Sequence, residues 1–268
     1  MPSTPKPYII DAHTHIYPAK IAAKATAAVH AFYDLPMSYV GSVDILLEEG
    51  RAAGISRFVV CSVATTPAQI AAVNRFLSAE CAAHPEFIGL GALHPASDNP
   101  QADIDDAVTR GFRGFKLHPD FQEFEADSPA MLEVYRRIAA TGLPLLIHAG
   151  DPRKPYSSPN RMANICKAVP DLTLIAAHFG GWREWHRTLD WLGEYPNCVV
   201  DTSSSLTEIE PETAAALVNG FGADRVLFAT DFPMWDAAEE LQRLRALHLP
   251  EDTLKKLYHA NAERIFRI

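Results

Sequence analysis

Short apolar runs bounded by glycine, proline or polar residues recur along the whole chain, and each has the length of a β-strand. Eight strands are predicted, over residues 8–15, 57–64, 87–95, 114–119, 144–150, 172–178, 198–204 and 226–233. Stretches of helical character separate them. The stretch 127–142 is predicted to be a helix that is capped by Asp127 or Ser128 before Pro129 and ends at Gly142, and residues 211–222 are predicted to form another.

The alternation of strands and helices indicates parallel strands that are joined by right-handed crossovers. Eight such units in about 250 residues match the size of a closed (β/α)8 TIM barrel. We therefore predict an α/β fold with a single domain over residues 1–268. An open doubly wound sheet is the alternative, but it favours a glycine fingerprint after its first strand, where this chain has HTHIYP. The first interval between strands is wider than the others, and residues 16–43 are predicted to form a lid.

Composition narrows the classes of function. The net charge is -9, which argues against a nucleic-acid partner because phosphate binding usually needs a basic surface. No apolar run reaches the roughly 20 residues that a membrane helix needs, and the first residues do not resemble a secretory signal. The four cysteines have no CxxC spacing and are expected to be reduced. We expect a cytoplasmic protein with a small-molecule substrate, and a homodimer is a candidate assembly.

Histidines gather where the predicted strands end. Six of the eleven histidines occupy such positions, and Asp231 ends the last strand. His13 and His15 are two residues apart on one strand, so their imidazoles share a face. In a TIM barrel the carboxyl ends of the strands carry the active site. Imidazoles and one carboxylate at that end predict a divalent-metal site with an open position for water. The six histidines are His13, His15, His94, His118, His148 and His178.

Four motifs carry a resemblance to a known family. They are DAHTH on the first strand, PLLIHAG on the fifth, LIAAHFGG on the sixth and LFATDFPMW on the eighth. With the final NAERIF, they resemble the amidohydrolase superfamily over nearly the whole chain. The similarity is to the amidohydrolase-related branch that includes aminocarboxymuconate-semialdehyde decarboxylase.

The resemblance implies a metal centre and roles for its residues. His13, His15 and His148 would be ligands, and Asp231 would bind the metal or accept a proton. His178 would polarise the substrate or assist a general base. Zinc is the expected metal from the ligand types, and manganese or iron would also suit them. A bound zinc ion lowers the pKa of its water to about 7, so that Asp231 would take the water proton while His178 stabilises the developing oxyanion.

Five further residues are candidate members of the pocket, and each has a purely structural alternative. Lys116 resembles the strand-four lysine that is carbamylated in some amidohydrolases, but it would otherwise be a buried charge paired with a carboxylate. His118 has the same strand parity, and His94 ends the third strand. Trp182 after the double glycine and Phe232 after Asp231 would wall the pocket or simply pack. Asp201, which ends the seventh strand, would contact substrate or cap the next segment.

Three functions remain open for such a site. A hydrolase would attack a small carboxylate, lactone, ester or amide through activated water, and a decarboxylase of the same branch would release CO2. The compact chain favours hydrolysis, because the decarboxylases of the branch tend to be longer. A catalytically inactive ligand-binding barrel is the third alternative. TatD-type deoxyribonucleases have similar motifs, but they use a glutamate on the third strand, where this chain has His94.

Overall fold

Parallel strands form the centre of the computed structural model, which describes residues 8–268. The order of the strands in space follows their order in the sequence. The strands are β1 Ile10–His15, β2 Arg57–Cys61, β3 Phe87–Gly89, β4 Gly91–Ala92, β5 Phe115–Leu117, β6 Leu145–Ile147, β7 Leu174–Ala176, β8 Cys198–Asp201 and β9 Val226–Leu227.

Backbone hydrogen bonds close these strands into a barrel. The amide of Ala12 donates to the carbonyl of Phe228 at 3.0 Å, and the amide of His15 donates to the carbonyl of Phe232 at 2.7 Å. These bonds join the first strand to the segment that follows the last. On the other side, Leu90 bridges β3 and β4 by donating to the carbonyl of Val60 at 3.0 Å. A closed ring of parallel strands with helical connections is a (β/α)8 barrel, as the alternation of the sequence predicts.

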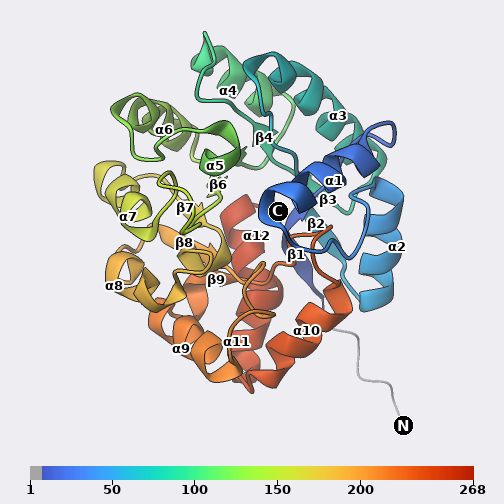
Figure 1. Cartoon of the computed structure of the whole chain (residues 1–268), viewed down its shortest axis with the longest axis vertical. Helices are drawn as coiled ribbons and strands as arrows, with labels where there is room; N and C mark the ends of the chain where they lie inside the picture. Colours follow the sequence, from blue (N-terminus) through green and yellow to red (C-terminus); the bar gives the residue numbers. More distant parts are fainter. Residues whose placement is uncertain (1–7) are drawn as a thin grey trace.

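Helices surround the strands as a ring, and α1 and α12 lie across its centre in Figure 1. Proline occupies the first turn of several of them, where its missing amide hydrogen costs nothing. The helices are α1 Ala22–Tyr33, α2 Val43–Ala53, α3 Ile70–Ala83, α4 Pro100–Thr109, α5 Pro119–Gln122, α6 Pro129–Thr141, α7 Pro159–Ala168, α8 Thr188–Leu192, α9 Pro211–Phe221, α10 Ala237–Ala246, α11 Glu251–Lys255 and α12 Asn261–Phe266.

The core has two apolar layers because strand side chains alternate in direction. On β6, Leu146 faces the barrel interior, whereas Leu145 and Ile147 pack against the surrounding helices. Helix α12 closes one end of the interior, where Ile265 and Phe266 join the inner layer. Burying a large apolar side chain stabilises the fold by about 1.5–3 kcal/mol, so both layers contribute to the stability of the barrel.

The predicted elements agree with the structure except at their ends. The helix predicted over 127–142 is α6, with Ser128 before it and Gly142 after it at a φ of 67°. Seven of the eight predicted strands run two to six residues past the C-terminal end of the observed strand. The predicted third strand is divided at Leu90, between β3 and β4.

Within residues 8–268, no helix combines the length and the apolar character that crossing a membrane would take.

Candidate functional site

A cavity of about 680 Å³ lies at the end of the barrel opposite α12. Its lining includes Asp231 and five of the six strand-end histidines, all except His94, and α1 forms much of its wall. The wall is largely apolar, with side chains such as Val29, Phe32 and Phe121. Part of the segment predicted to form a lid, residues 16–43, thus lines the cavity. This volume is in the range of a small-molecule site.

A bulge in β1 aims two histidines at this cavity. Ile10 and Ala12 belong to the inner layer of the barrel, so a regular strand would point His13 and His15 outward. The register with β2 shifts between Asp11 and Thr14, which adds one residue to β1. An extra residue reverses the parity of the strand, and bulges of this kind often redirect side chains at active sites. Both imidazoles consequently face the cavity.

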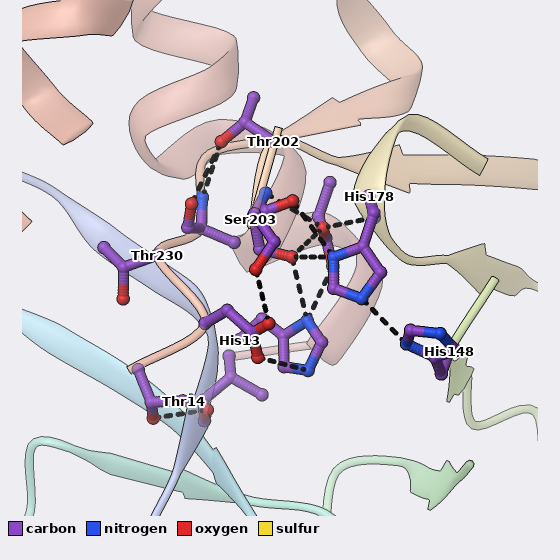
Figure 2. Close-up of polar contacts among 12 residues, drawn as sticks. His13, Thr14, His148, His178, Thr202, Ser203 and Thr230 are labelled. Carbon is purple, nitrogen blue, oxygen red and sulfur yellow. Dashed lines mark hydrogen bonds and ion pairs between the residues drawn. The ribbon is translucent and has the colours of Figure 1, made fainter. Parts of the chain in front are cut away.

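Hydrogen bonds fix the tautomer of His13. Its Nδ1 lies 3.1 Å from Asp201 Oδ2 and 3.1 Å from Ser203 Oγ. A carboxylate accepts only, so Nδ1 carries the hydrogen and Nε2 presents its lone pair to the cavity. Burial, assisted by the nearby cation of Lys116, lowers the pKa of His13 to about 4, which keeps the ring neutral. Figure 2 shows Ser203 beside the rings of His13 and His178.

Ionisable side chains converge around His13 Nε2. His15 Nε2 is 3.1 Å away, and Asp231 Oδ1 lies 3.6 Å from His13 Nε2 and 3.4 Å from His15 Nε2. The Ser204 hydroxyl holds the other oxygen of Asp231 at 2.7 Å. Burial opposes the ionisation of Asp231, yet the three nearby histidines hold the pKa of this carboxyl well below its ordinary range. Lys116 Nζ, 2.7 Å from His13 Nε2, places one positive charge against this group.

A second pair of imidazoles meets in the same cavity. His148 Nδ1 and His178 Nε2 are 3.0 Å apart. Figure 2 shows the contact between the two rings as a dashed line. His148 Nε2 donates to the Gly150 carbonyl at 2.7 Å, and His178 Nδ1 donates to the Ser203 carbonyl at 3.0 Å. A neutral imidazole has one hydrogen, so the two facing nitrogens both present lone pairs. Burial and neighbouring His178 hold the pKa of His148 well below its ordinary value, so its second nitrogen gains no proton.

Comparison with models of known protein families shows which family the chain belongs to. The Amidohydrolase model (Amidohydro_2) matches residues 10–268. The chain belongs to the amidohydrolase family. No curated protein sequence matches it.

Solved structures share the fold of this amidohydrolase at low sequence identity. An uncharacterized TIM-barrel protein of Bordetella bronchiseptica has a TM-score of 0.80 at 21% identity, covering 97% of this chain and 98% of the other. A dihydroxybenzoic acid decarboxylase of Polaromonas sp. JS666, with bound manganese and 2-nitroresorcinol, has a TM-score of 0.74 at 18% identity, covering 97% of each chain. A Pseudomonas putida protein named as a 2-pyrone-4,6-dicarboxylic acid hydrolase has a TM-score of 0.68 at 18% identity, also covering 97% of each.

The donor set of the amidohydrolase fits a divalent cation. Two imidazole nitrogens and a carboxylate oxygen within 3.6 Å of one another are atom types that bind divalent metal ions, and a cation among them would displace the protons that His15 and Lys116 direct there. His148 Nδ1 and His178 Nε2 face each other at 3.0 Å and offer two further nitrogen donors. Of the four predicted ligands, His13, His15 and Asp231 form one cluster, and His148 contacts His178 instead.

Three of the predicted pocket residues lie outside the cavity wall as the described residues define it, whereas Lys116 and His118 line it. His94 Nδ1 accepts the amide hydrogen of Ala96 at 3.1 Å, so its ring stabilises a turn. Trp182 is buried and donates to Glu208 at 3.1 Å. Phe232 is buried and stacks on Tyr39. None of these three side chains contributes to the cavity wall within the described residues, contrary to the expectation that they belong to the pocket.

Sequence reasoning missed two buried groups beside the site. The Tyr33 hydroxyl lies 2.8 Å from His118 Nε2, and Asp120 Oδ2 lies 3.6 Å from His148 Nε2. Tyr33 lies in an amphipathic helix, where a tyrosine commonly packs against the core, so nothing in the sequence predicts that its hydroxyl reaches the cavity. Asp120 follows the strand-end motif KLHP, and this position was the available signal. Asp201, which was expected to contact substrate or to cap a segment, instead holds His13 and the His178 amide.

Proposed function

We propose that this amidohydrolase is a metal-dependent hydrolase of a small cyclic ester or amide, such as a lactone. One observation carries the proposal. Asp231 is an ionised carboxylate on the cavity floor, held by Ser204 and next to the imidazoles of His13 and His15. A fixed anion of this kind is suited to accept a proton from an attacking water, and it is poorly suited to donate one.

The metal would be held by His13, His15 and Asp231, with His148 and His178 as further nitrogen donors beside them. When bound, a divalent ion would polarise the substrate carbonyl and lower the pKa of a water molecule. Asp231 Oδ1 would take the proton of that water and return it to the leaving oxygen or nitrogen. The lone pair on His178 Nε2 makes this ring an acceptor, so oxyanion stabilisation falls to the Lys116 ammonium. Zinc is the metal we propose, with manganese as the alternative.

Decarboxylation of an aromatic carboxylate is the second candidate, and the wall of the cavity favours it. Apolar side chains of α1 and of the residue before it cover the site, including Ile21, Val29 and Phe32. Loss of CO2 moves the localised charge of the carboxylate onto the ring, where the carbon then takes up a proton, so an environment that solvates the carboxylate poorly favours the reaction. The manganese-containing dihydroxybenzoic acid decarboxylase supports the same interpretation. Compactness of the chain does not oppose it, because the similarity extends over 97% of that decarboxylase.

Isotopes distinguish the two reactions in one experiment. Purified protein, reconstituted with zinc or with manganese, is incubated with panels of lactones, amides and hydroxybenzoates. In ¹⁸O-labelled water, hydrolysis places the label in the new carboxylate. In D2O, decarboxylation places deuterium on the ring carbon and releases CO2. Acid formation with ¹⁸O supports the proposal, whereas ring deuteration and CO2 release contradict it and establish the second candidate.

A further inference from the structure

Tyr33 brings a hydroxyl group from α1 to the cavity. The residue ends this helix, is 7% exposed and lines the cavity wall. Its ring packs edge-on against Trp182 with the centroids 5.1 Å apart, and lies 6.0 Å from the His148 ring. The hydroxyl therefore lies near the second pair of imidazoles, and neither the family motifs nor the proposed mechanism uses it.

A chain of hydrogen bonds determines the direction of this hydroxyl. The backbone amide of Phe121 donates to His118 Nδ1 at 3.2 Å, because His118 caps the N-terminus of α5. An amide hydrogen can meet this nitrogen only at its lone pair, so the hydrogen of His118 is on Nε2. His118 Nε2 lies 2.8 Å from the Tyr33 oxygen and must donate to it. Within residues 8–268 the Tyr33 oxygen has no other hydrogen-bond partner, which leaves its own hydrogen free.

Two further contacts hold Tyr33 in this place. The Arg153 guanidinium lies within 3.4 Å of the carbonyls of Phe32 and Tyr33, where cations stabilise the C-terminal end of a helix. Asp151 fixes Arg153 in turn through bonds of 2.9 and 2.8 Å. Burial raises the pKa of Tyr33 well above its ordinary value, so the phenol keeps its hydrogen. The donor is therefore fixed before any substrate arrives.

We propose that the Tyr33 hydroxyl donates a hydrogen bond to an oxygen of the bound substrate, such as a carboxylate, carbonyl or phenolate oxygen. His118 and Arg153 are its positioning residues. The inference rests on the proposed function for the existence of a small oxygen-bearing substrate, but not on whether that substrate is hydrolysed or decarboxylated. A hydrogen bond to a charged oxygen contributes about 1.5–3 kcal/mol, so its loss corresponds to roughly a 10- to 100-fold weaker interaction.

The Tyr33→Phe variant tests the bond, because it removes the hydroxyl and keeps the ring. Tyr135→Phe is the matched control, since Tyr135 is also buried and loses one hydrogen bond, to the Ala126 carbonyl, away from the cavity. Both variants are loaded with metal, and kcat/KM is measured for the substrate from the panels. Tyr33→Phe is expected to lose about 10- to 100-fold and Tyr135→Phe less than about twofold. Equal loss in both variants, or none in Tyr33→Phe, overturns the proposal.

Binding of salicylate to the metal-loaded protein, measured by calorimetry, separates this proposal from the proposed function. Weaker binding to Tyr33→Phe than to Tyr135→Phe supports the Tyr33 assignment even where no panel compound is turned over. Normal turnover that Tyr33→Phe leaves unchanged overturns the assignment while the proposed function stands. ¹⁵N NMR of labelled histidine gives a readout that needs no ligand. A hydrogen on His118 Nε2 supports the proposal, and a hydrogen on Nδ1 overturns it.

Discussion

Replacing Asp201 with asparagine should weaken metal binding, although Asp201 is not itself one of the proposed metal ligands. The two carboxylate oxygens have different partners. Oδ1 accepts the backbone amides of His178 at 2.9 Å and Ser203 at 3.1 Å, and Oδ2 accepts from His13 Nδ1 at 3.1 Å. In Asp201→Asn the amide oxygen must stay with the two backbone amides, since these can only donate. The NH2 group then occupies the place of Oδ2 and faces His13.

The consequence is a change of tautomer at His13. Its Nδ1 would face a donor, so the ring hydrogen would move to Nε2, the atom that lies among His15, Asp231 and Lys116. A protonated Nε2 cannot bind a metal ion. Loss of a partner that orients a metal-binding histidine typically costs 10- to 100-fold in metal affinity, which is about 1.4–2.7 kcal/mol. We expect Asp201→Asn to fall in this range.

Competition with a chromophoric chelator measures the affinity, and thermal unfolding of the metal-free protein shows whether the fold survives. Asp120→Asn is the matched control, because Asp120 is equally buried but its nearest ring nitrogen, His148 Nε2, is 3.6 Å away. Its Oδ2 is instead bonded to the Ser157 hydroxyl at 2.5 Å. We expect less than about a twofold change there, since no tautomer depends on Asp120. Wild-type metal affinity in folded Asp201→Asn would refute the reasoning.

Three other outcomes follow from the site and the core. Asp231→Asn should lower turnover by about 10²- to 10⁴-fold, because the proton acceptor is lost. Metal content is measured for the same sample, and unchanged turnover would exclude this role for Asp231. Removal of the metal with a chelator should abolish turnover and lower the unfolding temperature. The free energy of unfolding should fall by about 4 kcal/mol if the metal had been present at 1,000 times its Kd. Burial raises the pKa of Glu240 to about 7 from an ordinary 4.5, although Arg243 opposes this. Between pH 4.5 and about 7 the folded state therefore binds a proton that the unfolded state has lost, and the protein loses stability as the pH rises through this range. Glu240→Gln should stabilise the protein by up to about 3 kcal/mol at pH 8 and not at pH 4. Chemical denaturation at both pH values tests this.

The sequence predicted well the features that depend on neighbouring residues. Apolar runs and caps located the barrel strands and α6, and the spacing of His13 and His15 predicted two imidazoles on one face, whose Nε2 atoms are 3.1 Å apart. Contacts between distant residues had no such signal. The bond between His13 and Asp201 joins positions 188 residues apart, and that between Tyr33 and His118 joins positions 85 apart. Only the closed barrel brings these pairs together.

The bulge in β1 explains why periodicity alone could not place the site. Strict alternation through residues 10–15 would put Ile10 and Ala12 on one face and His13 and His15 on the other. Both sets face the axis of the barrel, at different heights. The extra residue between Asp11 and Thr14 makes this arrangement compatible with unbroken pairing to β2 above and below it. Nothing in DAHTH reveals an inserted residue, because Thr14 stabilises it through a bond to the Val59 carbonyl at 2.8 Å, on another strand. One strand can therefore supply apolar packing at its start and metal-binding imidazoles at its end. Alternation in its sequence alone would place only one of these two sets of side chains inside the barrel.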